Sequence, residues 1–90
     1  MPSAAVRRYW DWVTNEYPFC PCGCEVEQIH HIIHVNRQRI TKDDMLVCGL
    51  CSKCHTDLHQ SGGERQFLEL TGLDIVHLAT LRRHNFEVRA

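Results

Sequence analysis

Apolar residues near the start of the chain recur at helical spacing and predict a first helix over residues 3–16. Ser3 can cap its first turn, and Pro18 follows its end. The apolar positions at this spacing are Val6, Trp10, Val13 and Tyr17, with a second stripe of Ala5, Tyr9 and Trp12 beside them. A stripe of this width is typical of a helix that is buried along one face.

In the middle of the chain, the residue pattern changes from one typical of a helix to one typical of strands. Residues 26–35 are rich in β-branched side chains and predict a strand, and residues 45–47 predict a second short strand. A short helix is expected from Ser52 to about Gln60, where Ser61-Gly62-Gly63 would end it.

Two further helices are expected in the last third of the chain. The first covers residues 64–70, with Gly72 as its stop. Asp74 can cap the second, which would carry Ile75, Leu78 and Leu81 on one apolar face. The whole chain, residues 1–90, therefore reads as one α+β domain. It consists of an N-terminal helical part (1–18), a core (19–60) and C-terminal helices (64–90).

Composition narrows the class of protein. Ninety residues bury only a thin core, so an additional cross-link is expected, and six cysteines could supply it as disulfides or as zinc ligands.

Residues 1–20 show no apolar signal-peptide region, which predicts a cytoplasmic location. Thiols stay reduced there and bind metal rather than form disulfides. No apolar run approaches transmembrane length, so no membrane partner is expected. With 10 basic and 11 acidic side chains, the net charge of −1 excludes a protein that coats DNA by charge alone.

The cysteines form two clusters that predict a structural zinc site. Cys51 and Cys54 have the two-residue spacing of a zinc knuckle. In the first cluster the wider pair, Cys20 and Cys24, should chelate with less strain. We therefore expect one structural Zn²⁺ bound by Cys20, Cys24, Cys51 and Cys54. The competing ligands are Cys22 and Cys48.

Four histidines beside these clusters predict a second metal position. His55 and His59 are four residues apart on a predicted helix, so their imidazoles share one face. His30 and His31 are adjacent on a predicted strand and point to opposite sides. Only one of the pair can therefore join the helical histidines around a divalent ion, which leaves the other free to act as a base.

The order His-His, a gap, then Cys-x2-Cys-His-x3-His resembles the HNH nucleases. The resemblance implies a zinc-stapled ββα-metal core with flanking helices. The chain is also similar to phage and prophage members of that class, including RecA-dependent recombination nucleases. The similarity to these members lies in the tryptophan-containing segment 9–13 and in the segment from Phe67 to Gly72.

The resemblance assigns a role to each histidine. His31 matches the general base, and His30, His55 and His59 match the ligands of the catalytic metal. The middle residue of the motif is usually Asn, but the residues just ahead of Met45-Leu46 are aspartates. Asp44 is the candidate there, with Asp43 second, and its carboxylate would orient the base through a hydrogen bond.

The activity implied is hydrolysis of phosphodiester bonds by an endonuclease that uses Mg²⁺, Mn²⁺, Ni²⁺ or Zn²⁺. The expected partner is DNA, in phage or prophage recombination or processing, with RNA as the alternative substrate. A homodimer or a recombination-protein partner would suit such a nuclease.

Two other functions compete with this interpretation. Cys51-Ser52-Lys53-Cys54-His55 also matches the haem attachment pattern of c-type cytochromes, although that leaves the first cysteine cluster and the histidine pair without a role. A non-catalytic zinc module that binds nucleic acid or protein would explain the cysteines. It would not explain the four histidines.

Overall fold

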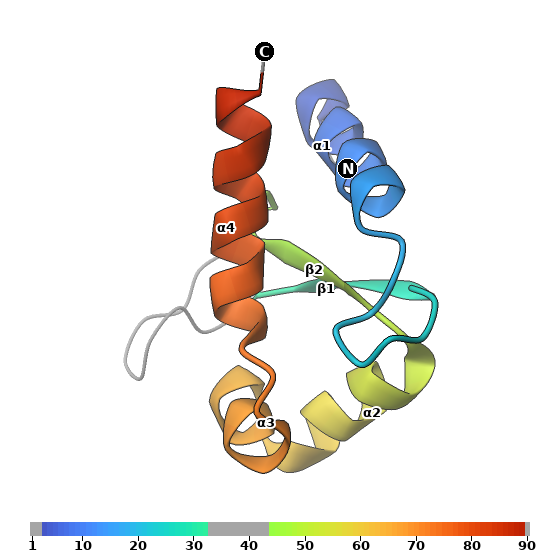
Figure 1. The fold of residues 1–90 in the computed structure, drawn as a ribbon, viewed down its shortest axis with the longest axis vertical. Coiled ribbons are helices and arrows are strands. Elements are labelled where there is room, and N and C mark those ends of the chain that lie inside the picture. The colour runs from blue at the N-terminus through green and yellow to red at the C-terminus, as the bar shows by residue number, and fades with distance from the viewer. Residues whose placement is uncertain (1–2, 33–43, 90) are drawn as a thin grey trace.

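The computed structural model of this protein describes residues 3–32 and 44–89. Over these residues, four helices pack around one two-stranded antiparallel sheet (Figure 1). Helices α1 and α4 stand side by side, with α1 above the sheet in this view and the lower end of α4 reaching down past the strands, while α2 and α3 lie below the sheet. The prediction of a small α+β fold is confirmed.

Helix α1 spans Ala4–Glu16 and agrees with the predicted element. The hydroxyl of Ser3 accepts a hydrogen bond from the N–H of Val6 at 3.2 Å, so the expected cap is present. Tyr9 and Val13 are the buried residues of this helix. Trp10 and Trp12 are half-buried and pack around them.

The sheet pairs β1, Gln28–His31, with β2, Val47–Leu50. The predicted first strand, 26–35, was too long at its start, because the N–H of Val26 bonds the carbonyl of Pro18 at 3.0 Å instead of extending the sheet. Its last residues, 33–35, lie outside the described residues.

The second strand begins and ends later than the predicted residues 45–47, since it runs from Val47 to Leu50 and residues 45 and 46 precede it. It includes Gly49, which local preference disfavours in a strand. A Cβ on Gly49 would lie 2.8 Å from both methyl groups of Val26. The close approach of the two segments therefore requires glycine at this position.

Three helices follow the sheet. Helix α2 spans Ser52–Ser61, α3 spans Glu64–Thr71, and α4 spans Ile75–Val88. These bounds match the predicted helices closely, and Asp74 accepts a hydrogen bond from the N–H of His77 at 2.9 Å, as expected of a cap. None of the helices in the described residues is long and apolar enough to cross a membrane.

The apolar face predicted for α4 was partly wrong. Its buried residues are Ile75, Ala79 and Arg82, whereas Leu81 is 43% exposed. Arg82 is accommodated because its guanidinium lies 4.3 Å from the ring centre of Tyr17 and donates to the sulfur of Cys48 at 3.8 Å. Cys48 is thus a buried core residue rather than a member of the cysteine clusters.

Candidate metal centres

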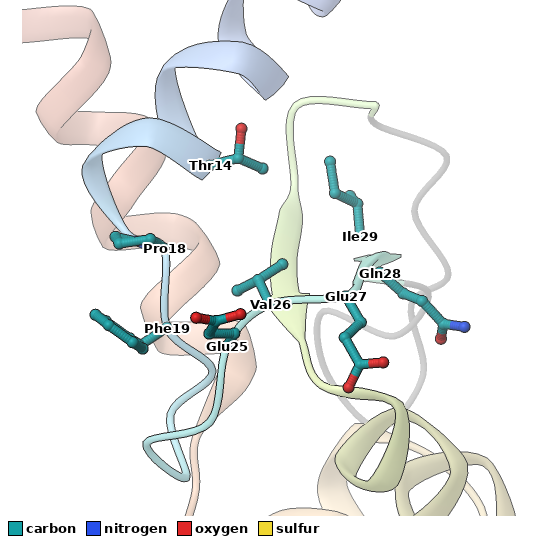
Figure 2. A pocket seen from close by; sticks show the side chains of 8 residues that line it. All are labelled: Thr14, Pro18, Phe19, Glu25, Val26, Glu27, Gln28 and Ile29. Carbon is teal, nitrogen blue, oxygen red and sulfur yellow. The ribbon is translucent and has the colours of Figure 1, made fainter.

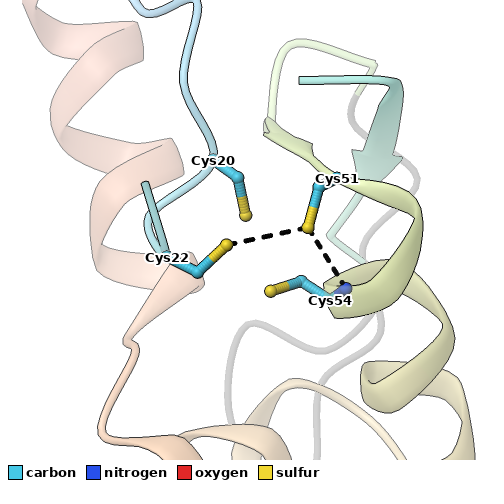
Figure 3. A group of neighbouring side chains, drawn as sticks. All are labelled: Cys20, Cys22, Cys51 and Cys54. Atoms are coloured by element: carbon cyan, nitrogen blue, oxygen red, sulfur yellow. Dashed lines mark hydrogen bonds between the residues drawn. The ribbon is translucent and has the colours of Figure 1, made fainter. Parts of the chain in front are cut away.

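Four cysteines from two segments gather into what we call the sulfur group: Cys20, Cys22, Cys51 and Cys54. Their sulfur atoms all lie within 4.8 Å of one another, and those of Cys22 and Cys51 are 3.7 Å apart (Figure 3). Sulfurs around one tetrahedral zinc are separated by about 3.8 Å, as follows from a Zn–S bond of about 2.3 Å. The donor set and its spacing therefore suit a structural metal such as zinc.

The sulfur group corrects the prediction that Cys24 is the fourth ligand. The chain turns tightly at this point, because the N–H of Gly23 bonds the carbonyl of Cys20 at 2.8 Å and Gly23 adopts a left-handed φ of 101°. Cys20 and Cys22 thus share one turn, and both join the group. Cys24 comes after the turn, beside the bridge between Phe19 and Glu25, and it is not part of the group.

Local hydrogen bonds favour a thiolate in this group. The backbone N–H of Cys24, followed by the thiols of Cys20 and Cys54, lowers the pKa of Cys22 to about 6. Burial raises the pKa of Cys20 and of Cys54, so these two thiols keep their protons until a cation replaces them. The first turn of α2 also bonds the group, since the N–H of Cys54 donates to the sulfur of Cys51 at 3.5 Å.

Three imidazoles form the nitrogen group, which consists of His30, His55 and His59. One nitrogen from each lies within 4.8 Å of the others, and the Nε2 atoms of His55 and His59 are 3.0 Å apart. Two nitrogen ligands of one tetrahedral zinc are separated by about 3.3 Å. The spacing of four on α2 and the inward side of β1 place these rings together, as the sequence predicted.

The surroundings of His55 favour the neutral imidazole that binds metals. Burial, followed by the charges of His30 and His59, lowers the pKa of His55. The side-chain amide oxygen of Gln28 contacts Nδ1 of His55. Nδ1 therefore carries the proton, and Nε2 remains free for a ligand role.

Glu27 connects the two groups by fixing the start of α2 to the beginning of β1. Its carboxylate accepts hydrogen bonds from the hydroxyl of Ser52 at 2.8 Å and from the N–H of Ser52 at 3.2 Å. These bonds, the hydroxyl first, lower the pKa of Glu27. Cys51 and His55 flank this contact, so one anchor positions a residue of each group.

His31 lies on the other side of β1 from His30 and is not part of the nitrogen group. Its Nε2 is 3.5 Å from a carboxylate oxygen of Asp44, and both side chains are about half exposed, at 45% and 52%. The indole N–H of Trp10 donates to the backbone carbonyl of Asp44 at 2.9 Å, and its ring meets that of His31 edge-on at 5.3 Å. Asp43, the other candidate, lies outside the described residues.

Comparison with protein-family models, curated proteins and solved structures finds no match to this chain. The side chains of the two groups and of the His31–Asp44 pair are therefore the observations that bear on function.

Two residues that touch the nitrogen group were not among the predicted site residues. They are Gln28, which contacts His55, and Glu64, whose buried carboxylate lies 3.2 Å from Nε2 of His30. Gln28 lies two residues before His30 on the predicted strand, and residues at this spacing share one side of a strand, which could have suggested it. Glu64 follows two glycines at the start of another helix, and nothing in the local sequence connects it to His30.

A pocket of about 400 Å³ opens beside β1 and the end of α1 (Figure 2). It is lined by Thr14, Pro18, Phe19, Glu25, Val26, Glu27, Gln28 and Ile29. The pocket contains no member of either metal group, and its two carboxylates would repel a phosphate. Its nearest link to the nitrogen group is Gln28.

Proposed function

We propose that this protein is a divalent-metal-dependent endonuclease of the HNH type that hydrolyses phosphodiester bonds in DNA. The observation that carries the proposal is the division of two adjacent histidines between the two sides of β1. His30 joins His55 and His59 in the nitrogen group, while His31 lies beside Asp44. One strand would thus present a metal ligand on one side and a base on the other.

The nitrogen group fits a catalytic rather than a purely structural ion. Three imidazoles leave a coordination position for water or phosphate, as in known catalytic sites. A divalent ion bound there would stabilise negative charge on the phosphate oxygens. The sulfur group fits a structural ion because it supplies four thiols, which complete a tetrahedral site.

His31 would act as the general base. Its half-exposed imidazole is open to a water molecule and can take a proton from it as that water attacks phosphorus. The carboxylate of Asp44 would orient the ring and stabilise the imidazolium that forms. Trp10, which bonds the backbone of Asp44 and packs against His31, would hold this pair in place.

The competing functions explain fewer of these contacts. Haem attachment would require Cys51 and Cys54 as thioether links, but both thiols lie within the sulfur group. A non-catalytic zinc module needs the sulfur group alone. It assigns no role to the nitrogen group or to the His31–Asp44 pair.

Brief EDTA treatment should stop plasmid cleavage without unfolding the protein. Three neutral imidazoles hold a divalent ion less firmly than four thiolates, so the ion of the nitrogen group should leave first. Adding Mg²⁺, Mn²⁺ or Ni²⁺ should restore cleavage, while elemental analysis shows that zinc is retained. Circular dichroism before and after treatment tests whether the fold is unchanged.

Calorimetric titration of the EDTA-treated protein supplies the control for this experiment. His55→Ala and His59→Ala should each weaken the divalent site and lower cleavage, with little change in circular dichroism. If wild-type protein shows no second divalent site, or if both variants cleave at the wild-type rate, the nuclease proposal fails. The non-catalytic zinc module would then be the better account.

Trp10→Phe should slow cleavage by about 2- to 10-fold. The substitution keeps an aromatic ring beside His31 but removes the indole N–H that bonds Asp44. One hydrogen bond contributes roughly 0.5–1.5 kcal/mol. The matched control is Trp12→Phe on the same helix, because Trp12 packs against Tyr9 and Phe86 instead. Initial cleavage rates of the two variants should differ, and equal rates would count against a positioning role for Trp10.

A further inference from the structure

A buried carboxylate contacts the imidazole of one member of the nitrogen group, His30. Glu64 is 4% exposed and His30 is 3% exposed, and Oε1 of Glu64 lies 3.2 Å from Nε2 of His30. A buried charge is costly unless it is paired and hydrogen-bonded. A buried contact between a carboxylate and an imidazole is therefore unusual in a 90-residue chain, which has only a small core.

The fold brings Glu64 to this position from a different element. His30 is on β1, and Glu64 is the first residue of α3, directly after the N-cap Gly63. The carboxylate thus also lies at the N-terminal end of a helix, where the helix dipole favours negative charge. Glu64 is outside the nitrogen group, whose nitrogens belong to His30, His55 and His59.

We propose that Glu64 is a positioning residue for a divalent ion in the nitrogen group and acts through His30. By accepting a hydrogen bond from Nε2, the carboxylate selects the tautomer of His30 that carries its proton there. Nδ1 then keeps the lone pair that a metal requires. Gln28 has the corresponding role at His55, where its oxygen contacts Nδ1 and leaves Nε2 free. In two of the three imidazoles, the ring nitrogen that is not offered to the metal thus contacts a side-chain oxygen, and this contact orients the ring.

This inference rests on the proposed metal at the nitrogen group, and binding experiments can separate the two. Co²⁺ is titrated into EDTA-treated protein that retains its zinc, and the affinity is measured for wild type, Glu64→Gln and Glu69→Gln. Glu64→Gln keeps an oxygen that can accept from Nε2 but removes the negative charge that makes His30 a more basic ligand. It should therefore weaken Co²⁺ binding by about 10- to 100-fold, the usual effect of losing such an outer carboxylate. Glu69→Gln is the matched control, because Glu69 lies on the same helix and pairs with Arg65 at the surface.

The visible spectrum at saturating Co²⁺ distinguishes a positioning residue from a ligand. If Glu64 acts through His30, the saturated spectra of wild type and Glu64→Gln should have the same shape. A changed spectrum would identify Glu64 as a ligand and overturn the inference, as would an unchanged affinity. Failure of wild-type protein to bind Co²⁺ would instead contradict the proposed function itself.

A measurement on wild-type protein keeps the inference testable if Glu64→Gln does not fold. Long-range ¹H–¹⁵N correlation spectra of the Zn²⁺-loaded protein report which ring nitrogen of each histidine carries a proton. His30 should carry its proton on Nε2 and bind the metal through Nδ1. A metal-bound Nε2 in His30 would overturn the inference.

Discussion

Replacing Cys22 by serine should release zinc from the sulfur group and unfold much of the protein, whereas replacing Cys24 by serine should do neither. The sulfur of Cys22 lies 3.7 Å from that of Cys51, and Cys24 is not part of the group. Structural zinc sites in small domains contribute about 10–16 kcal/mol of folding free energy. That is comparable with the roughly 5–15 kcal/mol that stabilises a typical domain.

The two serine variants form a matched pair, because both cysteines are exposed and lie only two residues apart in the chain. Elemental analysis should find zinc in Cys24→Ser but not in Cys22→Ser. Thermal melts followed by circular dichroism should show a cooperative transition only in the former. The reverse pattern would restore Cys24 as the ligand. Absence of zinc from wild-type protein, with all six thiols reactive, would remove the structural metal altogether.

Replacing His31 by alanine should reduce cleavage by about 10²- to 10⁴-fold, which is the usual contribution of a general base. Metal binding should be nearly unchanged, because His31 is on the side of β1 opposite to the nitrogen group. Cleavage rates and calorimetric titrations with Mn²⁺ measure the two properties separately.

His30→Ala is the informative comparison for this variant. It should lose both cleavage and divalent binding, because His30 belongs to the nitrogen group. The roles are wrongly assigned if His31→Ala loses the metal while His30→Ala keeps it. Wild-type cleavage by His31→Ala would remove the proposed base.

Local periodicity was sufficient to predict the helices and the pairing of His55 with His59, whereas the choice of His30 over His31 came from the resemblance to HNH nucleases. A spacing of four on a helix places His55 and His59 on one face whatever the rest of the chain does. Alternation along a strand likewise separates His30 from His31. These relations depend only on neighbouring residues, so the sequence contains them in full.

Contacts between distant segments were not predictable in the same way. The preference for Cys24 came from the length of the chelate loop, whereas in the folded chain Cys22, next to the left-handed Gly23, lies with Cys51 and Cys54. In α4, periodicity favoured Leu81 for burial. Arg82 is buried instead, because the ring of Tyr17 and the sulfur of Cys48 surround its guanidinium.

The sequence by itself determined the helices, the two kinds of metal-binding side chain and the separation of His30 from His31. Each of these follows from residue type and from spacing within one element. Only the tertiary structure decided which four thiols meet and which carboxylate stands behind His30. Cys22 approaches Cys51 across 29 positions of the chain, and His30 approaches Glu64 across 34. Such contacts depend on how β1, α2 and α3 pack together, and that packing reflects the whole core rather than any local pattern.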